Sequence, residues 1–162
     1  MKKNSRILIA GYKNIATLTL LRRLRQEGFS NLFFLSPDSH DLTDGRSVSS
    51  FFKSNKPEYS FLMHLREGGI EANIEYPAEL IYENLIIQAN IIHSAWQAKV
   101  KKLIFFASSC VYPKACPQPM KEEYLLTGAL EATSEPYSIA KISGIKMCQA
   151  YNRQYGSRFI SV

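Results

Sequence analysis

Strand-like runs and helix-like periodicities alternate along the whole chain. The runs are short and almost continuously apolar, which is typical of strands that are buried on both faces. Strands that alternate with helices predict an α/β fold in which one parallel sheet is covered on both faces. The expected strands are Arg6–Ala10, Asn31–Leu35, Tyr59–Leu65, Lys102–Ala107 and Arg158–Val162, and the expected helices are Asn14–Glu27, Arg46–Ser54, Pro77–Lys99 and Tyr137–Tyr155.

The first strand–helix junction carries a single glycine. In "RILIAGYKNIATLTLLRRL", Gly11 follows the apolar run and precedes a helical pattern. A strand, a glycine turn and a helix in this order begin a dinucleotide-binding unit, which normally carries two further glycines. Asn14 and Thr17 stand at those two positions. The stretch is therefore a cofactor loop, an altered cofactor loop or merely a turn. The helical period after it is carried by Ile15, Leu18, Leu21 and Leu24.

The composition is that of an ordinary globular chain. Its 162 residues are enough for one domain with a buried core, and 46% of them are hydrophobic and 21% charged. The net charge is +6, but the basic residues are scattered. A solvated helix face explains the densest cluster better than a nucleic-acid surface does, and the surplus also suits a phosphate-bearing small molecule. That cluster is Arg22, Arg23 and Arg25.

No segment indicates a membrane span, a leader peptide or a metal site. No apolar run approaches the roughly 20 residues of a membrane helix, and "MKKNSR" leads into a short strand-like run instead of a signal-peptide core. Cys110, Cys116 and Cys148 show no CxxC spacing, which argues against a disulfide framework and against a zinc site. We therefore expect a cytoplasmic protein without a bound metal.

A Tyr-x-x-x-Lys pair follows the long polar loop after the fourth predicted strand. Tyr137 and Lys141 are four residues apart, so a helix places them on one face. An ammonium near a phenol favours the phenolate, so Lys141 is expected to lower the pKa of Tyr137 and to let it exchange a proton near neutral pH. Ser108, at the end of the strand, is placed to hold the same carbonyl oxygen. The spacing alone is weak evidence, since about 0.7 such pairs arise by chance, but its position after the loop strengthens it.

Several phrases resemble one enzyme family. Gly11 after the first strand, "SSCVYP" and "EPYSIAK" resemble the extended short-chain dehydrogenase/reductase family, which has a doubly wound Rossmann-type fold. "GGIEANIEYPAELIYENL", "ANIIHSAW", "KKLIFFASSCVYPK" and "YNRQYG" are similar to the GDP-L-fucose synthases within it. The resemblance is strongest from Gly68 to the end and covers the nucleotide-binding half only, so a substrate domain is expected beyond residue 162. It implies NADPH-dependent epimerisation and reduction of a 4-keto-6-deoxy nucleotide sugar.

The resemblance also implies a role for each candidate residue. Tyr137 corresponds to the general acid, Lys141 to the residue that tunes it and contacts the nicotinamide ribose, and Ser108 to the hydroxyl that orients the substrate carbonyl. Cys110 corresponds to an acid/base of the epimerisation, and its histidine partner would lie beyond Val162.

The helices at 77–99 and 137–155 resemble those through which the family dimerises. "LIIQANIIHSAW" is apolar over more than one face, which agrees with burial against both a sheet and a partner helix. We therefore expect a homodimer; burial against the sheet alone is the alternative. None of His40, His64 and His93 matches the family's histidine, and His93 is expected to serve packing or subunit contact.

The chain departs from the family at the cofactor loop. The expected cofactor-binding residues are Gly11, Lys13, Asn14 and Ile15, together with Tyr137 and Lys141. Asn14 is tolerable in place of glycine because asparagine enters left-handed conformations. Thr17 is expected to push the helix off the strand or towards the phosphates. Lys13 offers a positive charge or is simply solvated.

Two further departures affect the cofactor. After the third strand, bulky residues replace the family's small ones and are expected to occupy cofactor space: Met63, His64, Leu65, Arg66 and Glu67. "SPDSHD" lacks an arginine for the 2′-phosphate of NADP, although Asp38 or Asp41 could bind an adenosine hydroxyl. The chain is thus an active relative with weakened NADP(H) binding, an inert dimer-forming homologue, or part of a longer enzyme. A nucleotide-binding module without sugar chemistry is a further, weaker hypothesis.

Overall fold

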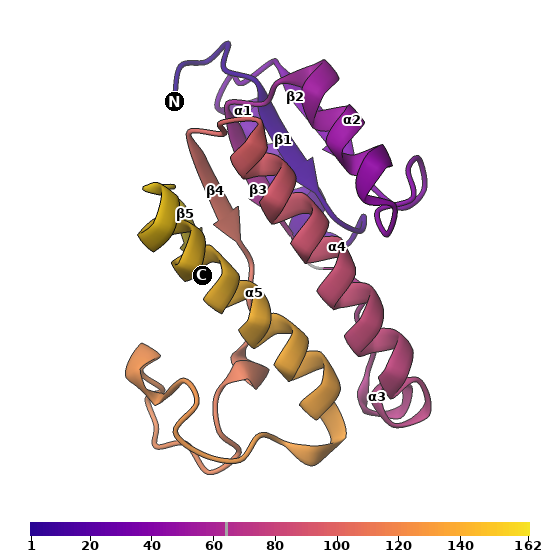
Figure 1. Cartoon of the computed structure of the whole chain (residues 1–162), viewed down its shortest axis with the longest axis vertical. Helices are drawn as coiled ribbons and strands as arrows, with labels where there is room; N and C mark the ends of the chain where they lie inside the picture. The colour runs from indigo at the N-terminus through magenta and orange to yellow at the C-terminus, as the bar shows by residue number, and fades with distance from the viewer. Residues whose placement is uncertain (64) are drawn as a thin grey trace.

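A five-stranded parallel sheet with the order β2-β1-β3-β4-β5 forms the centre of the molecule (Figure 1). The computed structural model describes residues 1–63 and 65–162. Every neighbouring pair of strands is parallel, which confirms the predicted α/β fold with a parallel sheet. The chain moves from β1 to β2 on one side and then crosses to β3 on the other, so a topological switch point lies between β1 and β3. The strands are β1 Ile7–Ala10, β2 Leu32–Leu35, β3 Tyr59–Leu62, β4 Lys102–Phe105 and β5 Phe159–Ser161.

Within the described residues, five helices connect the strands, and four of them match the predicted ones. The fifth, α3 (Ile70–Glu75), was not predicted, because its six residues are too few to show a helical period and its Ile70 and Ile74 are exposed. Three short 3₁₀ turns punctuate the long loop between β4 and α5: η1 Ser109–Val111, η2 Glu122–Tyr124 and η3 Ala132–Ser134. The other helices are α1 Ile15–Gln26, α2 Gly45–Asn55, α4 Pro77–Gln97 and α5 Glu135–Tyr155.

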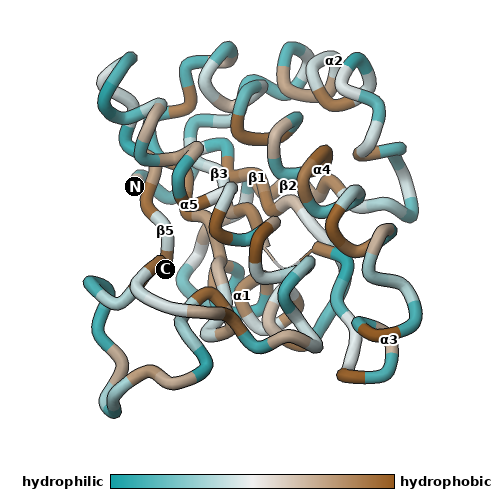
Figure 2. The backbone as a smooth tube through the Cα atoms, turned by 60° about the horizontal axis from the view of Figure 1, so that its bottom comes forward, coloured by the Kyte–Doolittle hydropathy of each residue, from teal (hydrophilic) through white to brown (hydrophobic). Residues whose placement is uncertain are grey.

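The helices cover the two faces of the sheet unequally. One face carries α2, α4 and α5, and the larger apolar core lies beneath them. The other face carries α1 over a smaller core. Figure 1 shows α4 and α5 side by side in front of the sheet, and Figure 2 shows hydrophobic residues on the central strands and hydrophilic ones on the outer loops. In the described ranges, no helix is long and apolar enough to cross a membrane.

Close packing of α4 against α5 depends on one glycine. A Cβ at Gly144 would lie 2.5 Å from Phe105 Cζ and 2.8 Å from Gln88 Oε1, so only glycine fits there. Gln88 Nε2 in turn donates a hydrogen bond of 2.5 Å to the carbonyl oxygen of Ala140. These contacts hold α5 against the sheet and against α4, and thereby set the position of the side chains near its N-terminus.

The buried face of α1 differs from the predicted one. Ile15 is 85% exposed and Leu18 52% exposed, whereas Thr17 and Leu24 are buried. The helix itself was predicted correctly. Ile15 and Leu18 were expected on its buried face, but they lie on its exposed side. The cause is local: Thr17 turns inward to bond to the preceding loop.

Candidate active site

The candidate catalytic side chains meet where β4 ends and α5 begins. Ser108 follows β4 and precedes η1, and its backbone is extended. Tyr137 and Lys141 lie on the inward face of α5 and are 9% and 0% exposed. Lys141 Nζ donates a hydrogen bond of 3.0 Å to the carbonyl oxygen of Phe106, just past β4. The fold thus brings together three residues that are far apart in the sequence.

Two adjoining cavities open beside these residues and share Gly68, Ser108 and Tyr137. The smaller cavity has a volume of about 280 Å³ and the larger about 590 Å³. Cavities of this size suit a small molecule. Glu67 completes the lining of the smaller cavity; the larger one is also lined by Gly69, Ile70, Asn73, Cys110, Glu131, Thr133 and Ser134.

The environment of Tyr137 raises its pKa above the ordinary value. Burial is the main cause, and the charge of Glu67 and the thiol of Cys110 act in the same direction. A hydrogen bond with Ser108 lowers the pKa but does not outweigh burial. The expectation of a pKa lowered towards neutrality is therefore wrong for this chain by itself, because burial outweighs every lowering influence on Tyr137. Tyr137 is a neutral phenol that carries its proton.

Lys141 is affected in the opposite sense. Burial lowers the pKa of its ammonium to about 8, and electrostatic interactions with Glu67 and Cys110 partly offset that effect. Its Nζ lies 5.0 Å from the centre of the Phe105 ring and 5.8 Å from that of Tyr137. Lys141 is thus a buried cation whose charge is sensitive to pH just above neutrality.

The bulky residues after β3 were predicted to occupy the cofactor space, but Met63 and Leu65 do not line the cavity. Met63 and Leu65 are each 1% exposed, and they pack into the smaller and the larger core respectively. The chain leaves the regular strand after Leu62, which lets these two side chains enter opposite cores. His64 lies outside the described residues. The predicted obstruction of the cofactor space is therefore wrong for Met63 and Leu65.

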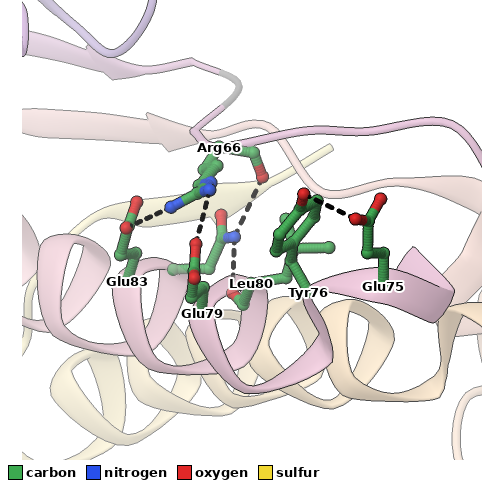
Figure 3. A network of polar contacts seen from close by, with 7 residues as sticks. Arg66, Glu75, Tyr76, Glu79, Leu80 and Glu83 are labelled. Atoms are coloured by element: carbon green, nitrogen blue, oxygen red, sulfur yellow. Dashed lines mark hydrogen bonds and ion pairs between the residues drawn. The ribbon is translucent and has the colours of Figure 1, made fainter. Parts of the chain in front are cut away.

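Arg66 turns away from the cavity and towards α4. Its guanidinium forms ion pairs with Glu79, at 2.7 Å, and with Glu83. The side-chain amide of Asn84 donates to the Arg66 carbonyl oxygen at 2.9 Å and to the Leu80 carbonyl oxygen at 2.7 Å. Figure 3 shows this network beside the start of α4. The segment after β3 is thus attached to α4 through both the side chain and the backbone of Arg66.

Glu67 is the residue of this site whose place the sequence did not reveal. It was grouped with the bulky replacements, yet it lines the smaller cavity with Ser108 and Tyr137. The signal that distinguishes it is its charge: it is the one carboxylate in a segment otherwise made of apolar and basic residues, directly before two glycines.

The loop between β1 and α1 is closed by side chains in place of glycines. Gly11 has a φ of +134°, a backbone conformation that side chains disfavour. Asn14 caps α1, since its Oδ1 accepts a hydrogen bond of 3.0 Å from the Thr17 amide. Thr17 Oγ1 donates to the Tyr12 carbonyl oxygen at 2.9 Å and the residue is fully buried.

Both expectations for these replacements need correction. Asn14 has an extended backbone with a φ of −114°, so its tolerance comes from helix capping and not from a left-handed conformation. Thr17 points into the protein, so it does not push towards a phosphate. A helix N-terminus behind a glycine turn attracts anions, and these residues fit the pyrophosphate of a dinucleotide.

The charged residues near this loop are paired with one another. Lys13 Nζ lies 3.0 Å from Asp38 Oδ2 and 5.7 Å from the centre of the Phe34 ring. Lys13 is therefore not the purely solvated lysine of the alternative interpretation. Asp41 accepts hydrogen bonds from the amide and the hydroxyl of Thr43, which lower the pKa of its carboxyl group.

The described histidines take part in packing. His40 meets the edge of Phe51 at 5.1 Å between ring centres. His93 bonds through Nδ1 to Tyr151 Oη at 2.7 Å and lies against Trp96, which agrees with the packing role predicted for it. In the part of the chain that the structure describes, no three His, Cys, Asp or Glu side chains gather in a way that could hold a metal ion.

Comparison with known proteins decides the family. The sequence profile of the NAD-dependent epimerase/dehydratase family matches residues 7–162, nearly the whole chain. The chain belongs to this family. The epimerase/dehydratase relatives include a protein named putative GDP-L-fucose synthase 2 from Arabidopsis thaliana, which is 49% identical over 96% of this chain. The GDP-L-fucose synthase of Escherichia coli is 48% identical over 97% of it.

Solved structures of the epimerase/dehydratase family agree with the fold. The GDP-mannoheptose C4 reductase MlghC from Campylobacter jejuni, solved with NADP bound, superimposes with a TM-score of 0.95 at 45% identity over 99% of this chain. The chain spans about half the length of these relatives, namely 47% and 49% of the two curated proteins and 51% of the reductase.

Proposed function

We propose that this chain is the NADP(H)-binding part of a nucleotide-sugar epimerase/reductase of the GDP-L-fucose synthase type. The observation that carries the proposal is the convergence of Ser108, Tyr137 and Lys141 beside the two cavities. The relatives named above supply the substrate class. Because the chain spans about half their length, we assign the substrate domain to residues beyond 162.

The geometry suits reduction of a ketone. A carbonyl oxygen in the shared part of the cavities meets the hydroxyls of Ser108 and Tyr137. Because its pKa is raised, Tyr137 is protonated at neutral pH. Its Oη donates that proton to the oxygen as the carbonyl becomes an alcohol. The Lys141 ammonium stabilises the phenolate that remains. NADPH, when bound, supplies the hydride for this reduction.

The cofactor site of the proposal consists of the α1 loop and the start of α5. Gly11 lies in the loop before α1, Asn14 caps the helix and the exposed Ile15 is its first residue. Free amides at this N-terminus stabilise a pyrophosphate. Lys13 adds a positive charge there once it separates from Asp38. Tyr137 and Lys141 lie at the nicotinamide end. We propose NADP(H) as the cofactor, bound more weakly than in relatives with three glycines.

Epimerisation needs a further acid/base group. Cys110 lines the larger cavity with Tyr137 and is half-buried, so its thiol has access to a bound sugar. We assign it the role of its counterpart in the family, with a histidine partner beyond Val162. Ser108, Cys110 and Tyr137 line one cavity, and Lys141 is buried one helical turn after Tyr137. The presence of all four residues favours an enzyme over the inert homologue.

A homodimer through α4 and α5 completes the proposal. These two helices pack together along one face of the sheet, and their outer surfaces expose large side chains. Tyr82 is 61%, Tyr155 46% and Ile139 41% exposed. Covering such groups with the same surface of a second copy removes apolar area from water. We also propose a cytoplasmic location, where the three cysteines remain free thiols.

The test is turnover by the full-length protein that contains this chain. With NADPH and GDP-4-keto-6-deoxymannose, we expect loss of NADPH absorbance and formation of a reduced nucleotide sugar. Calorimetric titration with NADPH, followed by NADP⁺, measures the cofactor site separately. The absence of cofactor binding at millimolar concentration would refute the oxidoreductase proposal.

A further inference from the structure

Asn73 lies in the wall of the larger cavity and carries a hydrogen-bond acceptor that has no partner. The residue is 8% exposed and lines the cavity of about 590 Å³ together with Ser108, Cys110 and Tyr137. Its side-chain oxygen Oδ1 is buried and accepts no hydrogen bond from the described part of the chain. Most buried polar groups in proteins are paired, because an unpaired one is unfavourable. The reduction described above gives this oxygen no role.

The side-chain amide of Asn73 can take only one orientation. Its Nδ2 donates hydrogen bonds of 3.0 Å to the carbonyl oxygens of both Gly68 and Gly69. Turning the amide over would place Oδ1 against these two oxygens, which are acceptors themselves. Oδ1 is therefore fixed on the side of the amide that points away from the glycines, and only a donor from another direction can reach it.

The unpaired atom determines what kind of ligand group fits. An amide oxygen only accepts hydrogen bonds, so Oδ1 requires an O–H or N–H group and cannot bind a phosphate or the reacting ketone. Ser108 and Tyr137 present hydroxyls to the ketone and line both cavities, whereas Asn73 and Cys110 line only the larger one. Asn73 is thus placed to contact the sugar beside its ketone. In a 4-keto-6-deoxy sugar joined to a diphosphate through C1, only C2 and C3 carry hydroxyls.

We propose that Asn73 is a specificity residue whose Oδ1 accepts a hydrogen bond from a ring hydroxyl, at C2 or C3, of the keto sugar. The inference rests on the proposed function, since it names the substrate feature that the same site recognises. Oδ1 is closed to water in this structure. Thr133 and Ser134 of η3 line the same cavity, and their short side chains shift to admit the hydroxyl, since rotamer changes on binding are common. A sugar without this hydroxyl leaves Oδ1 unpaired and binds more weakly.

The experiment measures sugar binding by the NADPH-loaded full-length enzyme. The ligands are GDP-6-deoxymannose and its 2-deoxy and 3-deoxy counterparts, which lack a ketone and therefore do not react with NADPH. By calorimetry, we expect wild type to prefer GDP-6-deoxymannose over at least one deoxy sugar by about fivefold in Kd, which corresponds to one neutral hydrogen bond. Asn73→Ala should bind these two sugars within about twofold of each other. Asn73→Asp keeps an acceptor and should retain the preference, although it loses the bonds to the two glycines.

Asn84 provides the matched control, because it is a buried amide that holds the same segment of the chain. It is 0% exposed, its Nδ2 donates to the Arg66 carbonyl oxygen at 2.9 Å, and its Oδ1 also has no partner. Unlike Asn73, it lines neither of the two cavities. Asn84→Ala should therefore weaken the binding of all three sugars by the same factor and leave the fivefold preference in place.

Binding and turnover separate the two proposals. Turnover of GDP-4-keto-6-deoxymannose with NADPH tests the proposed function; an enzyme that shows the expected binding pattern but never oxidises NADPH would refute that function and support the role of Asn73. The role of Asn73 is refuted if wild type does not distinguish the three sugars, if the preference survives in Asn73→Ala, or if it is lost in Asn73→Asp or Asn84→Ala. Weaker NADPH binding by Asn73→Ala with an unchanged sugar preference would assign the acceptor to the cofactor and refute it as well.

Discussion

The hydroxyl of Thr17 donates a hydrogen bond of 2.9 Å to the main-chain carbonyl oxygen of Tyr12, and this contact closes the loop that precedes α1. Thr17 is fully buried, and its amide is capped by Asn14. The side chains of Asn14 and Thr17 thus stabilise a direct turn from β1 into α1, which glycines allow in other dinucleotide-binding units. The relationship explains how a loop with one glycine keeps the geometry of a dinucleotide-binding unit.

Thr17→Val should destabilise this loop. Valine has nearly the same shape but cannot donate to the Tyr12 carbonyl oxygen, and the loss of one hydrogen bond costs about 1 kcal/mol in the free energy of unfolding. We expect weaker NADPH binding as well, since the α1 N-terminus loses its fixed position. Denaturant unfolding and calorimetry measure the two effects. Thr17→Ser keeps the donor and should stay near wild type; equal losses in both variants would contradict the role of the hydroxyl.

Asp38→Asn should strengthen NADPH binding. The carboxylate holds Lys13 at 3.0 Å, and a neutral amide releases the ammonium for a phosphate. Both side chains are more than half exposed, so the unfolding free energy should change by less than about 1 kcal/mol. We expect several-fold tighter binding at low salt, with the gain reduced at high salt. Lys13→Ala should bind more weakly than wild type; an unchanged affinity in both variants would exclude Lys13 from the cofactor site.

Tyr137→Phe in the full-length enzyme should lower keto-sugar reduction by about 10²- to 10⁴-fold, the usual contribution of a positioned proton donor. Phenylalanine fills the same space on α5, so the fold and the oligomeric state should remain as in wild type. Steady-state kinetics and size-exclusion chromatography check the two parts. Tyr59→Phe, at the opposite end of β3 from the site, is the matched control. Turnover at the wild-type rate in Tyr137→Phe would show that Tyr137 does not donate the proton in the proposed reduction.

Lys141 should make stability depend on pH in a defined direction. Its pKa falls from an ordinary value of 10.5 to about 8 in the folded chain because of burial. Below pH 8 the folded state carries a buried charge at a cost; between pH 8 and 10.5 the unfolded chain binds the extra proton, so the unfolding free energy rises with pH. Lys141→Met removes this contribution. We expect the stability of wild type relative to Lys141→Met to increase from pH 7 to pH 10.

That difference is measured by urea unfolding of both proteins at each pH, since other titrating groups contribute equally to both. A constant difference across the range would show that Lys141 does not titrate there. The titration of Lys141 also affects the proposed reduction. The ammonium that stabilises the Tyr137 phenolate is lost as the pH rises through about 8.

The local patterns of the sequence were sufficient for the secondary structure of most of the chain. Each strand lies in a mostly apolar stretch of sequence, and four helices show their period or their end signals, such as Gly156 with a φ of +65° after α5. The six-residue α3 was not predicted, because fewer than two helical turns carry almost no periodicity. The positions of Ser108, Tyr137 and Lys141 followed from their place at the ends of predicted elements, together with the resemblance to a known family.

What the sequence determined by itself was therefore the order of elements, the family and the residue types available for chemistry. Only the tertiary structure decided where the exceptional side chains point. Thr17 and Met63 turn into the core, Glu67 lines the cavity, and the pKa of Tyr137 rises although a lysine lies one helical turn away. The physical reason is that local pattern fixes backbone conformation over a few residues. Burial, charge and side-chain direction depend on groups brought together from distant parts of the chain.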